Sequence, residues 1–402
     1  QLSVITGPNQ VRYDDLGVQL IEGEGAAPTV AIDVARLGGM YGDKIRLIGT
    51  EAGVGVHSGG TIFSSAGTLV IDSMGKLTLS GGTAGASTSV SLHGADGVHN
   101  RGVIDAGTQL TITGAGSGVV NHGTLGARSS LTVAGTGTGG AFNDGVVSAQ
   151  AELRITGAGD VVNNGTISTT ADLTITGERG IINGGVLSTS GNLTVTGAGV
   201  ASTGTLAAGV DALGVVGHTG KLSVSTSGRL DATGRNIAGG DIALDGSTLD
   251  LSGSDTNAGA NMTLGAHNAD IRLDRSLTVA KGTLTITAKA GTVYNNAASR
   301  DASRGIEAAH IHIEAAGLDN TNGTLSQTGS LASTIRLAGK LANGGGSIAS
   351  NGQSMTLESG TLDNDDGEIR HAGAGLLTIT AADLHNQRGI IKAAGAGVID
   401  AA

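Results

Sequence analysis

Apolar and polar positions alternate in short runs along this chain, and between Val98 and Gly199 the pattern returns every 20 to 22 residues. Each repeat places an Asn before a Gly-containing turn and, further on, a Leu at the start of an alternating run such as Leu-Thr-Ile-Thr. The recurring residues are Asn100, Asn121, Asn143, Asn163 and Asn183, and Leu110, Leu131, Leu153, Leu173 and Leu193. A fixed period of this length without a helical pattern is typical of a solenoid.

A single repeat predicts the strands. Residues 173–176 (Leu-Thr-Ile-Thr) alternate between apolar and polar side chains, the two-residue period of a strand with one buried face. Residues 161–162 (Val-Val) and Ile167 supply two further short strands, and residues 163–165 (Asn-Asn-Gly) provide a turn between them. The sequence therefore predicts an all-β chain folded as a parallel β-helix, with one repeat of about 20–22 residues per coil.

The repeat length also predicts dimensions and an interior. Coils one strand spacing apart rise about 4.8 Å each, so roughly 19 coils would form a rod on the order of 90 Å long. Leu would lie over Leu and Asn over Asn along the bore, and the Asn amides could bond from coil to coil. We expect this ladder and the Leu stack to be the structural signature of the chain.

Four stretches succeed one another along the sequence. Residues 1–58 lack the period and contain both prolines, and residues 59–209 carry the regular repeat. Residues 210–317 keep apolar alternation with a looser period, and residues 318–402 carry a second repeat that contains triplets such as Leu-Asp-Asn. The leucines of this second repeat are Leu318, Leu341, Leu362 and Leu384. No Gly/Ser-rich or charged linker separates the stretches, so we expect one continuous rod.

Composition narrows the possible functions. The formal net charge is -11 and the 23 basic residues are scattered singly, while aromatic residues make up 1% of the chain, so nucleic acid is not an expected partner. No apolar run approaches the roughly 18 to 20 residues of a membrane-spanning helix. The chain has no Cys, which suits a protein that crosses a membrane unfolded. It begins at Gln1 without a signal segment and ends within its pattern, so we expect a piece of a longer protein.

Two clusters of possible metal ligands are weak. Residues 363–368 (Asp-Asn-Asp-Asp-Gly-Glu) suggest a calcium loop, but an EF-hand frame puts Leu362 and Gly373 where acidic ligands are required. A polar corner of the β-helix is the favoured interpretation. His310 and His312 would face the same side of a strand, with Glu314 as their one acidic neighbour in that pattern. We predict no metal site and no cofactor.

Catalytic motifs are also missing from the sequence. The chain contains no Gly-x-Ser-x-Gly elbow and no phosphate loop. The main enzymatic alternative is a β-helical polysaccharide-degrading enzyme, which needs paired carboxylates, usually beside aromatic residues that stack on sugars. Tyr13, Tyr41 and Tyr294 are far apart in coil number, and acidic residues do not recur in register with them. We therefore predict a protein that is not an enzyme and has no catalytic residues.

One segment resembles a known family. Residues 34–56 resemble the segment that closes the secretion domain of filamentous-haemagglutinin-type exoproteins, which include the contact-dependent growth-inhibition effectors. The residues that carry this resemblance are Leu37, Gly38, Gly39, Met40, Tyr41, Gly49, Thr50, Glu51, Gly53 and Gly55. The later Leu-Asp-Asn repeats resemble the haemagglutinin repeats of the same proteins. The Asn-Pro-Asn-Gly-like element of the family's secretion domain is absent, since residues 7–10 read Gly-Pro-Asn-Gln.

The resemblance implies a right-handed β-helix that is exported by two-partner secretion through an outer-membrane transporter to the bacterial cell surface or beyond. Residues 1–58 would then be the distal end of the secretion domain. The implied function is that of an extended shaft, from an adhesin or a growth-inhibition effector, that displays a distal functional part. A target-cell receptor would be bound by regions outside this chain. A single-chain autotransporter passenger remains an alternative, because it would differ only in the part of the protein after residue 402.

Overall fold

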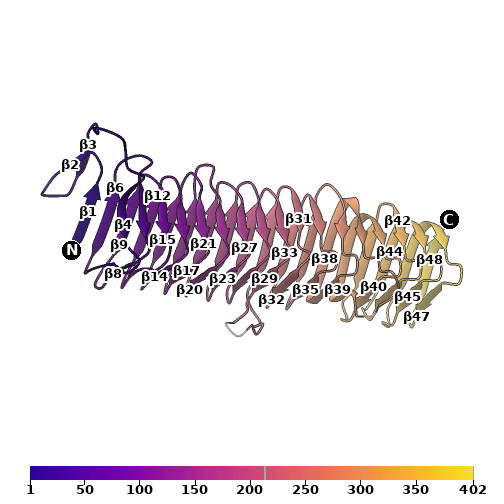
Figure 1. The fold of residues 1–402 in the computed structure, drawn as a ribbon. Helices are drawn as coiled ribbons and strands as arrows, with labels where there is room; N and C mark the ends of the chain where they lie inside the picture. Colours follow the sequence, from indigo (N-terminus) through magenta and orange to yellow (C-terminus); the bar gives the residue numbers. More distant parts are fainter. Residues whose placement is uncertain (212–213, 302, 402) are drawn as a thin grey trace. The chain divides into compact units, whose positions relative to one another are not determined.

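The computed structural model describes residues 1–211, 214–301 and 303–401. These residues contain strands and no helix, and they divide into two compact units, Gln1–Ser188 and Thr189–Ala402. Each unit is a stack of coils built from parallel strands (Figure 1). The predicted class, an all-β parallel β-helix, is confirmed. Because the described residues form no helix at all, none of them makes an apolar helix of membrane-spanning length.

The strands that begin in the first unit are short, with three to five residues each. They are β1 (Leu2–Thr6), β2 (Asn9–Val11), β3 (Val18–Leu20), β4 (Val30–Val34), β5 (Gly39–Gly42), β6 (Ile45–Gly49), β7 (Gly55–Ser58), β8 (Thr61–Ser64), β9 (Leu69–Ser73), β10 (Leu77–Leu79), β11 (Thr83–Ala86), β12 (Val90–Gly94), β13 (Val98–Asn100), β14 (Val103–Ala106), β15 (Leu110–Gly114), β16 (Val119–Asn121), β17 (Thr124–Ala127), β18 (Leu131–Gly135), β19 (Ala141–Asn143), β20 (Val146–Ala149), β21 (Leu153–Gly157), β22 (Val161–Asn163), β23 (Thr166–Thr169), β24 (Leu173–Gly177), β25 (Ile181–Asn183) and β26 (Val186–Thr189).

The strands that begin in the second unit include longer ones. They are β27 (Leu193–Gly197), β28 (Val200–Ser202), β29 (Thr205–Ala208), β30 (Leu222–Thr226), β31 (Arg229–Asp231), β32 (Arg235–Ala238), β33 (Ile242–Gly246), β34 (Thr248–Asp250), β35 (Asp255–Ala258), β36 (Met262–Ala266), β37 (Ile271–Arg272), β38 (Leu277–Tyr294), β39 (Gly305–Asp319), β40 (Thr324–Gln327), β41 (Ser333–Leu337), β42 (Lys340–Ala342), β43 (Ser347–Ser350), β44 (Met355–Asp363), β45 (Glu368–His371), β46 (Leu377–His385), β47 (Ile390–Ala393) and β48 (Gly397–Ala401).

Three strands make one coil in the regular part of the first unit, as the sequence predicts. Strands β22, β23 and β24 succeed one another around a coil, and each pairs in parallel with the equivalent strand of the preceding coil, β19, β20 and β21. The register places Leu131 opposite Leu110, Leu153 opposite Leu131 and Leu173 opposite Leu153. These steps of 21, 22 and 20 residues equal the repeat length read from the sequence.

The coils of the first unit start earlier than the visible sequence period. Strands β4, β5 and β6 pair in parallel with β7, β8 and β9, and β1 pairs with β6. The register steps from β4, β5 and β6 to β7, β8 and β9 are 22 to 25 residues, as between Gly39 and Thr61 or Val30 and Gly55, and the step from Leu2 on β1 to Ile45 on β6 is 43. An antiparallel hairpin of β2 and β3 interrupts the chain between β1 and β4. Uneven steps and this insertion hide the coils of residues 30–49 from a search for a 20-residue repeat.

The sequence period of the second unit is irregular at two places. Leu193 pairs with Leu222, 29 residues later, because β29 and β30 are farther apart in sequence than neighbouring strands of the regular coils. Strands β38 and β39 each continue without a break through positions that form separate strands in the other coils. Their pairing has register irregularities between Ala280 and Thr283 and between Ala288 and Thr292. The alternation of buried and outer positions survives in both strands, so the core continues through them.

The core of each unit is a stack of aliphatic side chains. Leu110, Leu153 and Leu173 are fully buried, whereas the outward Thr174 is half-buried. A strand's side chains point alternately to the two faces, so this difference arises from the two-residue period. Stacked aliphatic side chains exclude water from the bore, and their burial provides most of the favourable free energy of folding.

Leu173→Asp should therefore damage the first unit far more than Thr174→Asp. The first change puts a carboxylate without a partner into the bore, and the second adds a charge to a solvated face. The measurement is the rate of cleavage by a nonspecific protease under native conditions, compared with the unchanged chain. Equal sensitivity of the two variants would show that the assignment of inner and outer positions is wrong.

Candidate functional site

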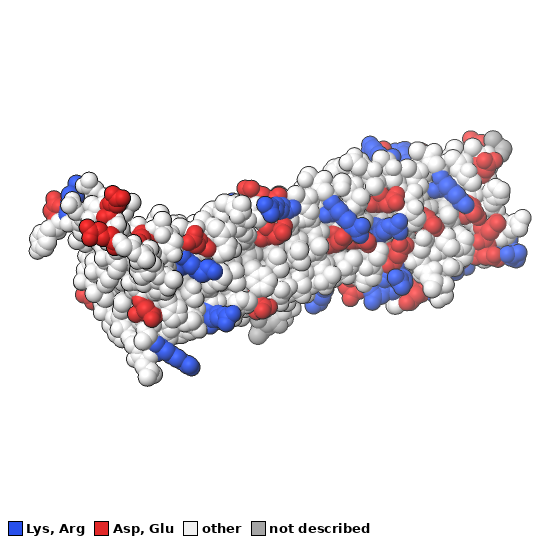
Figure 2. Space-filling view, turned by 45° about the horizontal axis from the view of Figure 1, so that its top comes forward, with Lys and Arg blue, Asp and Glu red and all other residues white. Residues whose placement is uncertain are grey.

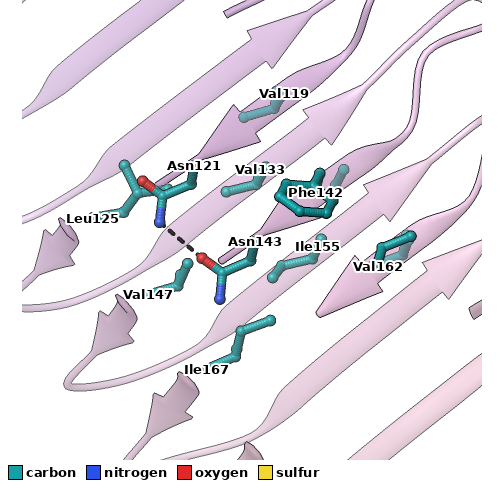
Figure 3. A pocket seen from close by; sticks show the side chains of 12 residues that line it. Val119, Asn121, Leu125, Val133, Phe142, Asn143, Val147, Ile155, Val162 and Ile167 are labelled. Atoms are coloured by element: carbon teal, nitrogen blue, oxygen red, sulfur yellow. Dashed lines mark hydrogen bonds between the residues drawn. The ribbon is translucent and has the colours of Figure 1, made fainter. Parts of the chain in front are cut away.

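The predicted asparagines lie at the same corner of successive coils. Asn100, Asn121, Asn143, Asn163 and Asn183 each end a short strand, and they are buried, with 1–5% of their surface exposed. The Nδ2 group of each of the first four donates to Oδ1 of the next, at 2.8 Å in all four cases. Figure 3 shows the bond between Asn121 and Asn143 among the aliphatic side chains of the bore. The five side chains form a continuous ladder.

The first four ladder amides also bond within their own corners. Asn100 Nδ2 donates to the carbonyl oxygen of Gly102 at 3.1 Å, and Asn100 Oδ1 accepts from the N–H of Gly102 at 3.0 Å. The ladder amides thus bond both along the stack and within the turn, which is what a buried amide requires. Backbones approach so closely at this corner that a Cβ atom at Gly165 would collide with the carbonyl oxygen of Gly145. The Asn-x-Gly pattern is therefore dictated by the corner.

A second ladder is absent from the sequence-based predictions. Asn295, Asn320, Asn343, Asn364 and Asn386 lie at one corner of the second unit, with Nδ2–Oδ1 distances of 2.7, 2.7, 2.7 and 2.6 Å. The sequence carries a signal for it in the triplets that begin at Leu318, Leu341, Leu362 and Leu384, although the leucines alone do not reveal it. The Asn two residues after each of these leucines identifies the ladder, since its steps of 23, 21 and 22 residues match those of the leucines.

The leucines of the regular repeat form a second stack, on other strands than the asparagines. Leu110, Leu131, Leu153 and Leu173 are register partners on β15, β18, β21 and β24. Leu193 belongs to the second unit, where it is fully buried opposite Leu222. The predicted asparagines therefore form a polar corner, and the predicted leucines form part of the apolar core.

The residues that carry the family resemblance are spread over three strands and two turns. Gly39, Met40 and Tyr41 lie in β5, Gly49 ends β6, Gly55 begins β7, and Leu37, Gly38, Thr50, Glu51 and Gly53 lie in the connecting turns. The Thr50 hydroxyl donates to the carbonyl oxygen of Thr6 at 2.8 Å and accepts from Asn9 Nδ2 at 3.0 Å. Leu37 is fully exposed. The segment thus fastens the first strand and the hairpin to the stack.

The two clusters weighed as metal sites serve other contacts. His310, His312 and Glu314 lie on the outer face of β39, where Glu314 forms an ion pair with Lys289 at 3.0 Å. In residues 363–368, Asn364 belongs to the second ladder and Asp366 accepts from Arg388. Among the described residues no group of three or more metal-ligating side chains comes together.

Ion pairs on the outer face of the second unit join successive coils. Lys340 Nζ donates to Asp363 Oδ2 at 2.9 Å, and this hydrogen bond lowers the pKa of Asp363 below its usual value. The hydrogen bond from the Arg388 guanidinium likewise lowers the pKa of Asp366. On the face shown in Figure 2, Lys and Arg side chains stand beside Asp and Glu side chains. Exposed pairs of this kind contribute little to stability, and they leave no extended patch of one charge on that face.

Comparison with known proteins finds one matching repeat family and several relatives. The haemagglutinin repeat family matches residues 4–81, 201–272, 267–345, 332–387 and 370–402. A protein named tRNA nuclease CdiA-2 from Burkholderia pseudomallei (strain 1026b) is 39% identical over 305 residues, 76% of this chain and 8% of that protein. A protein named Toxin CdiA from Yersinia pestis is 35% identical over 360 residues, 88% of this chain and 9% of that protein. No solved structure matches the chain.

Asn163→Ala tests the ladder. It removes a buried amide and both ladder hydrogen bonds that this amide makes, with Asn143 and with Asn183, so the free energy of unfolding should fall by about 1–3 kcal/mol. Its neighbour Asn164 is exposed and supplies a matched control, for which Asn164→Ala should change the free energy by no more than about 0.5 kcal/mol. Denaturant unfolding followed by circular dichroism measures both. Equal effects of the two substitutions would reduce Asn163 to an ordinary turn residue.

Proposed function

The chain belongs to the haemagglutinin repeat family, and on that premise we propose that it is a segment of the extended shaft of a secreted bacterial surface exoprotein. The shaft displays a functional part that lies elsewhere in the protein. The observation that carries this proposal is the in-register stack of coils, which gives each unit a regular interior with buried Asn ladders. The charges on the outer face are dispersed. Relatives named as a toxin and a tRNA nuclease agree with a display role, because the chain spans only 8–9% of their length.

The proposed location is the outside of a Gram-negative cell, either attached or released. The partner for export is an outer-membrane two-partner-secretion transporter, as the family implies. We also propose that residues 1–58 are the distal end of the secretion domain and that residues 59–209, 210–317 and 318–402 form successive parts of the shaft. A receptor on a target cell would be contacted by regions outside the chain.

Coil-by-coil stacking also suits export. In a solenoid each repeat is stabilised by contact with its neighbours, so a newly emerged coil can fold on the coil before it. Folding on the outer side would hinder backward movement of the chain through the transporter. The Asn ladder supports this view because an Asn side chain of the last folded coil offers a donor to the coil that folds next.

The alternatives from the sequence have less support. A polysaccharide-degrading enzyme would need aromatic residues gathered beside carboxylates, but Tyr13 lies in the loop between β2 and β3, Tyr41 on β5, and Tyr294 on β38. The Tyr294 ring makes a cation–π contact with Arg272, whose guanidinium carbon lies 4.7 Å from the ring centroid. A display role requires no catalysis by the shaft. The relatives point to growth-inhibition exoproteins, so the autotransporter alternative is not favoured either.

The display role predicts that purified residues 1–402 bind cells weakly or not at all. Large aromatic anchors of the kind that dominate binding interfaces are scarce, with three Tyr, two Phe and no Trp in the chain. The measurement is a titration onto epithelial cells, bacterial cells and a glycan panel, with a full-length relative as the positive control. We expect no saturation. Saturable binding at micromolar or tighter affinity would make the shaft itself the adhesin.

A further inference from the structure

Three side chains from successive coils meet on the outer face of the first unit. Asp33 on β4 and His57 on β7 are register partners, and Ser80 directly follows β10, which pairs with β7 on its other side. His57 Nδ1 lies 2.6 Å from Asp33 Oδ1, and His57 Nε2 lies 2.8 Å from Ser80 Oγ. One imidazole thus bridges a carboxylate and a hydroxyl through its two nitrogens, the hydrogen-bond order of a Ser-His-Asp triad.

The partners fix where the protons lie. An ionised Asp33 carboxylate can only accept a hydrogen bond, so the proton of a neutral His57 ring must be on Nδ1. Nε2 is then an acceptor, and the Ser80 hydroxyl donates to it at 2.8 Å, a shorter contact than the 3.5 Å between that hydroxyl and the carbonyl oxygen of Ser58. This is the tautomer in which an imidazole can take the proton of a serine hydroxyl as the oxygen attacks.

Comparison with similar pairs shows that the serine is an addition. Asp72 and His93 make the same contact between successive coils, with His93 Nδ1 2.8 Å from Asp72 Oδ1. His267 makes a corresponding contact through its other nitrogen, with Nε2 2.8 Å from Asp245 Oδ2. Within the described residues, neither of these two histidines has a hydroxyl on its other ring nitrogen. Linking two coils therefore needs only the His-Asp pair, and the site at His57 differs from these two pairs in the serine on the second ring nitrogen.

The site is open to a ligand. Ser80 is exposed, and 35% of the His57 side chain and 65% of the Asp33 side chain are accessible. A neighbouring groove of about 330 Å³ is lined by His57 together with Val56, Lys76 and Thr78, and Ser80 and Asp33 lie outside this lining. The N–H groups of Gly81 and Gly82, which directly follow Ser80, donate no hydrogen bond within the described part of the chain. Free backbone N–H groups next to a nucleophile are the usual donors to the oxyanion of an acyl-transfer intermediate.

We propose that Asp33, His57 and Ser80 form an acyl-acceptor site that reacts with carboxylic esters. Ser80 Oγ bonds to the carbonyl carbon of the ester while its proton moves to His57 Nε2. The bond between that carbon and the leaving oxygen then breaks, and the leaving oxygen takes the proton from Nε2 as an alcohol. The product is an O-acyl serine on the outer face, a covalent modification that goes beyond the display role.

The test uses p-nitrophenyl acetate as the probe and residues 1–402 as the protein. Acetylation is located and timed by mass spectrometry of proteolytic peptides. We expect Ser80 to be the fastest-reacting serine and His57→Ala to slow its acetylation by at least about a hundredfold, the usual contribution of a general base. Asp33→Asn should also slow it, because the amide no longer holds the imidazole in the reactive tautomer.

Two matched controls separate the triad from a general surface effect. Ser65 is exposed and bonded to the carboxylate of Asp43 at 3.1 Å, without a histidine, and should react slowly. His93→Ala removes the equivalent pair without a serine and should leave the acetylation rate of Ser80 unchanged. Circular dichroism of each variant checks that the stack is intact. Acetylation of Ser80 no faster than that of Ser65, or unchanged by His57→Ala in a folded variant, would overturn the proposal.

Discussion

Backbone hydrogen bonds from coil to coil are the interaction on which each unit depends. Parallel pairing with a step of one coil means that a side chain is covered by the side chain at the same position in the next coil. Leu110 is covered by Leu131, and Asn121 by Asn143. A bore of aliphatic side chains stays dry only if the same class of residue recurs at each inner position, and each ladder amide completes its hydrogen bonds through the amide of the next coil. The repeat in the sequence is the consequence of this geometry.

The same constraint leaves the outer face free to vary. Outer positions meet solvent and their counterparts on the next coil, so they tolerate Thr, Asp, Arg or His without disturbing the core. Lys340 with Asp363 and Asp33 with His57 are both products of this freedom, joining coils that are 23 and 24 residues apart in sequence. A shaft can therefore keep a uniform interior for display while one part of its surface gains chemistry of its own.

How much can be predicted from the sequence depends on regularity. The fold class, the coil length and the positions of Asn163 and Leu173 can be inferred because the steps between repeats are nearly equal. The coils of residues 30–49 cannot, because their steps are larger and a hairpin separates them from β1. The contact of Asp33, His57 and Ser80 also escapes prediction, since it depends on a register that the sequence does not show. The regular spacing of Asn100 to Asn183 predicts the first ladder. The second ladder has a similar spacing, which is visible when the asparagines of the Leu-x-Asn triplets are followed along the sequence and not their leucines.

The most direct test of the in-register stack is a pair of distances between nitroxide labels, measured by pulsed electron paramagnetic resonance in the first unit. Ser91 and Thr174 are outer positions four coil steps apart, and Arg46 and Thr174 are six steps apart. With about 4.8 Å per step, the two distance distributions should be narrow and should centre at about 19 and 29 Å. A difference near about 10 Å supports stacked coils in register. Equal distances, or broad distributions that do not increase with the number of coils, would contradict the account.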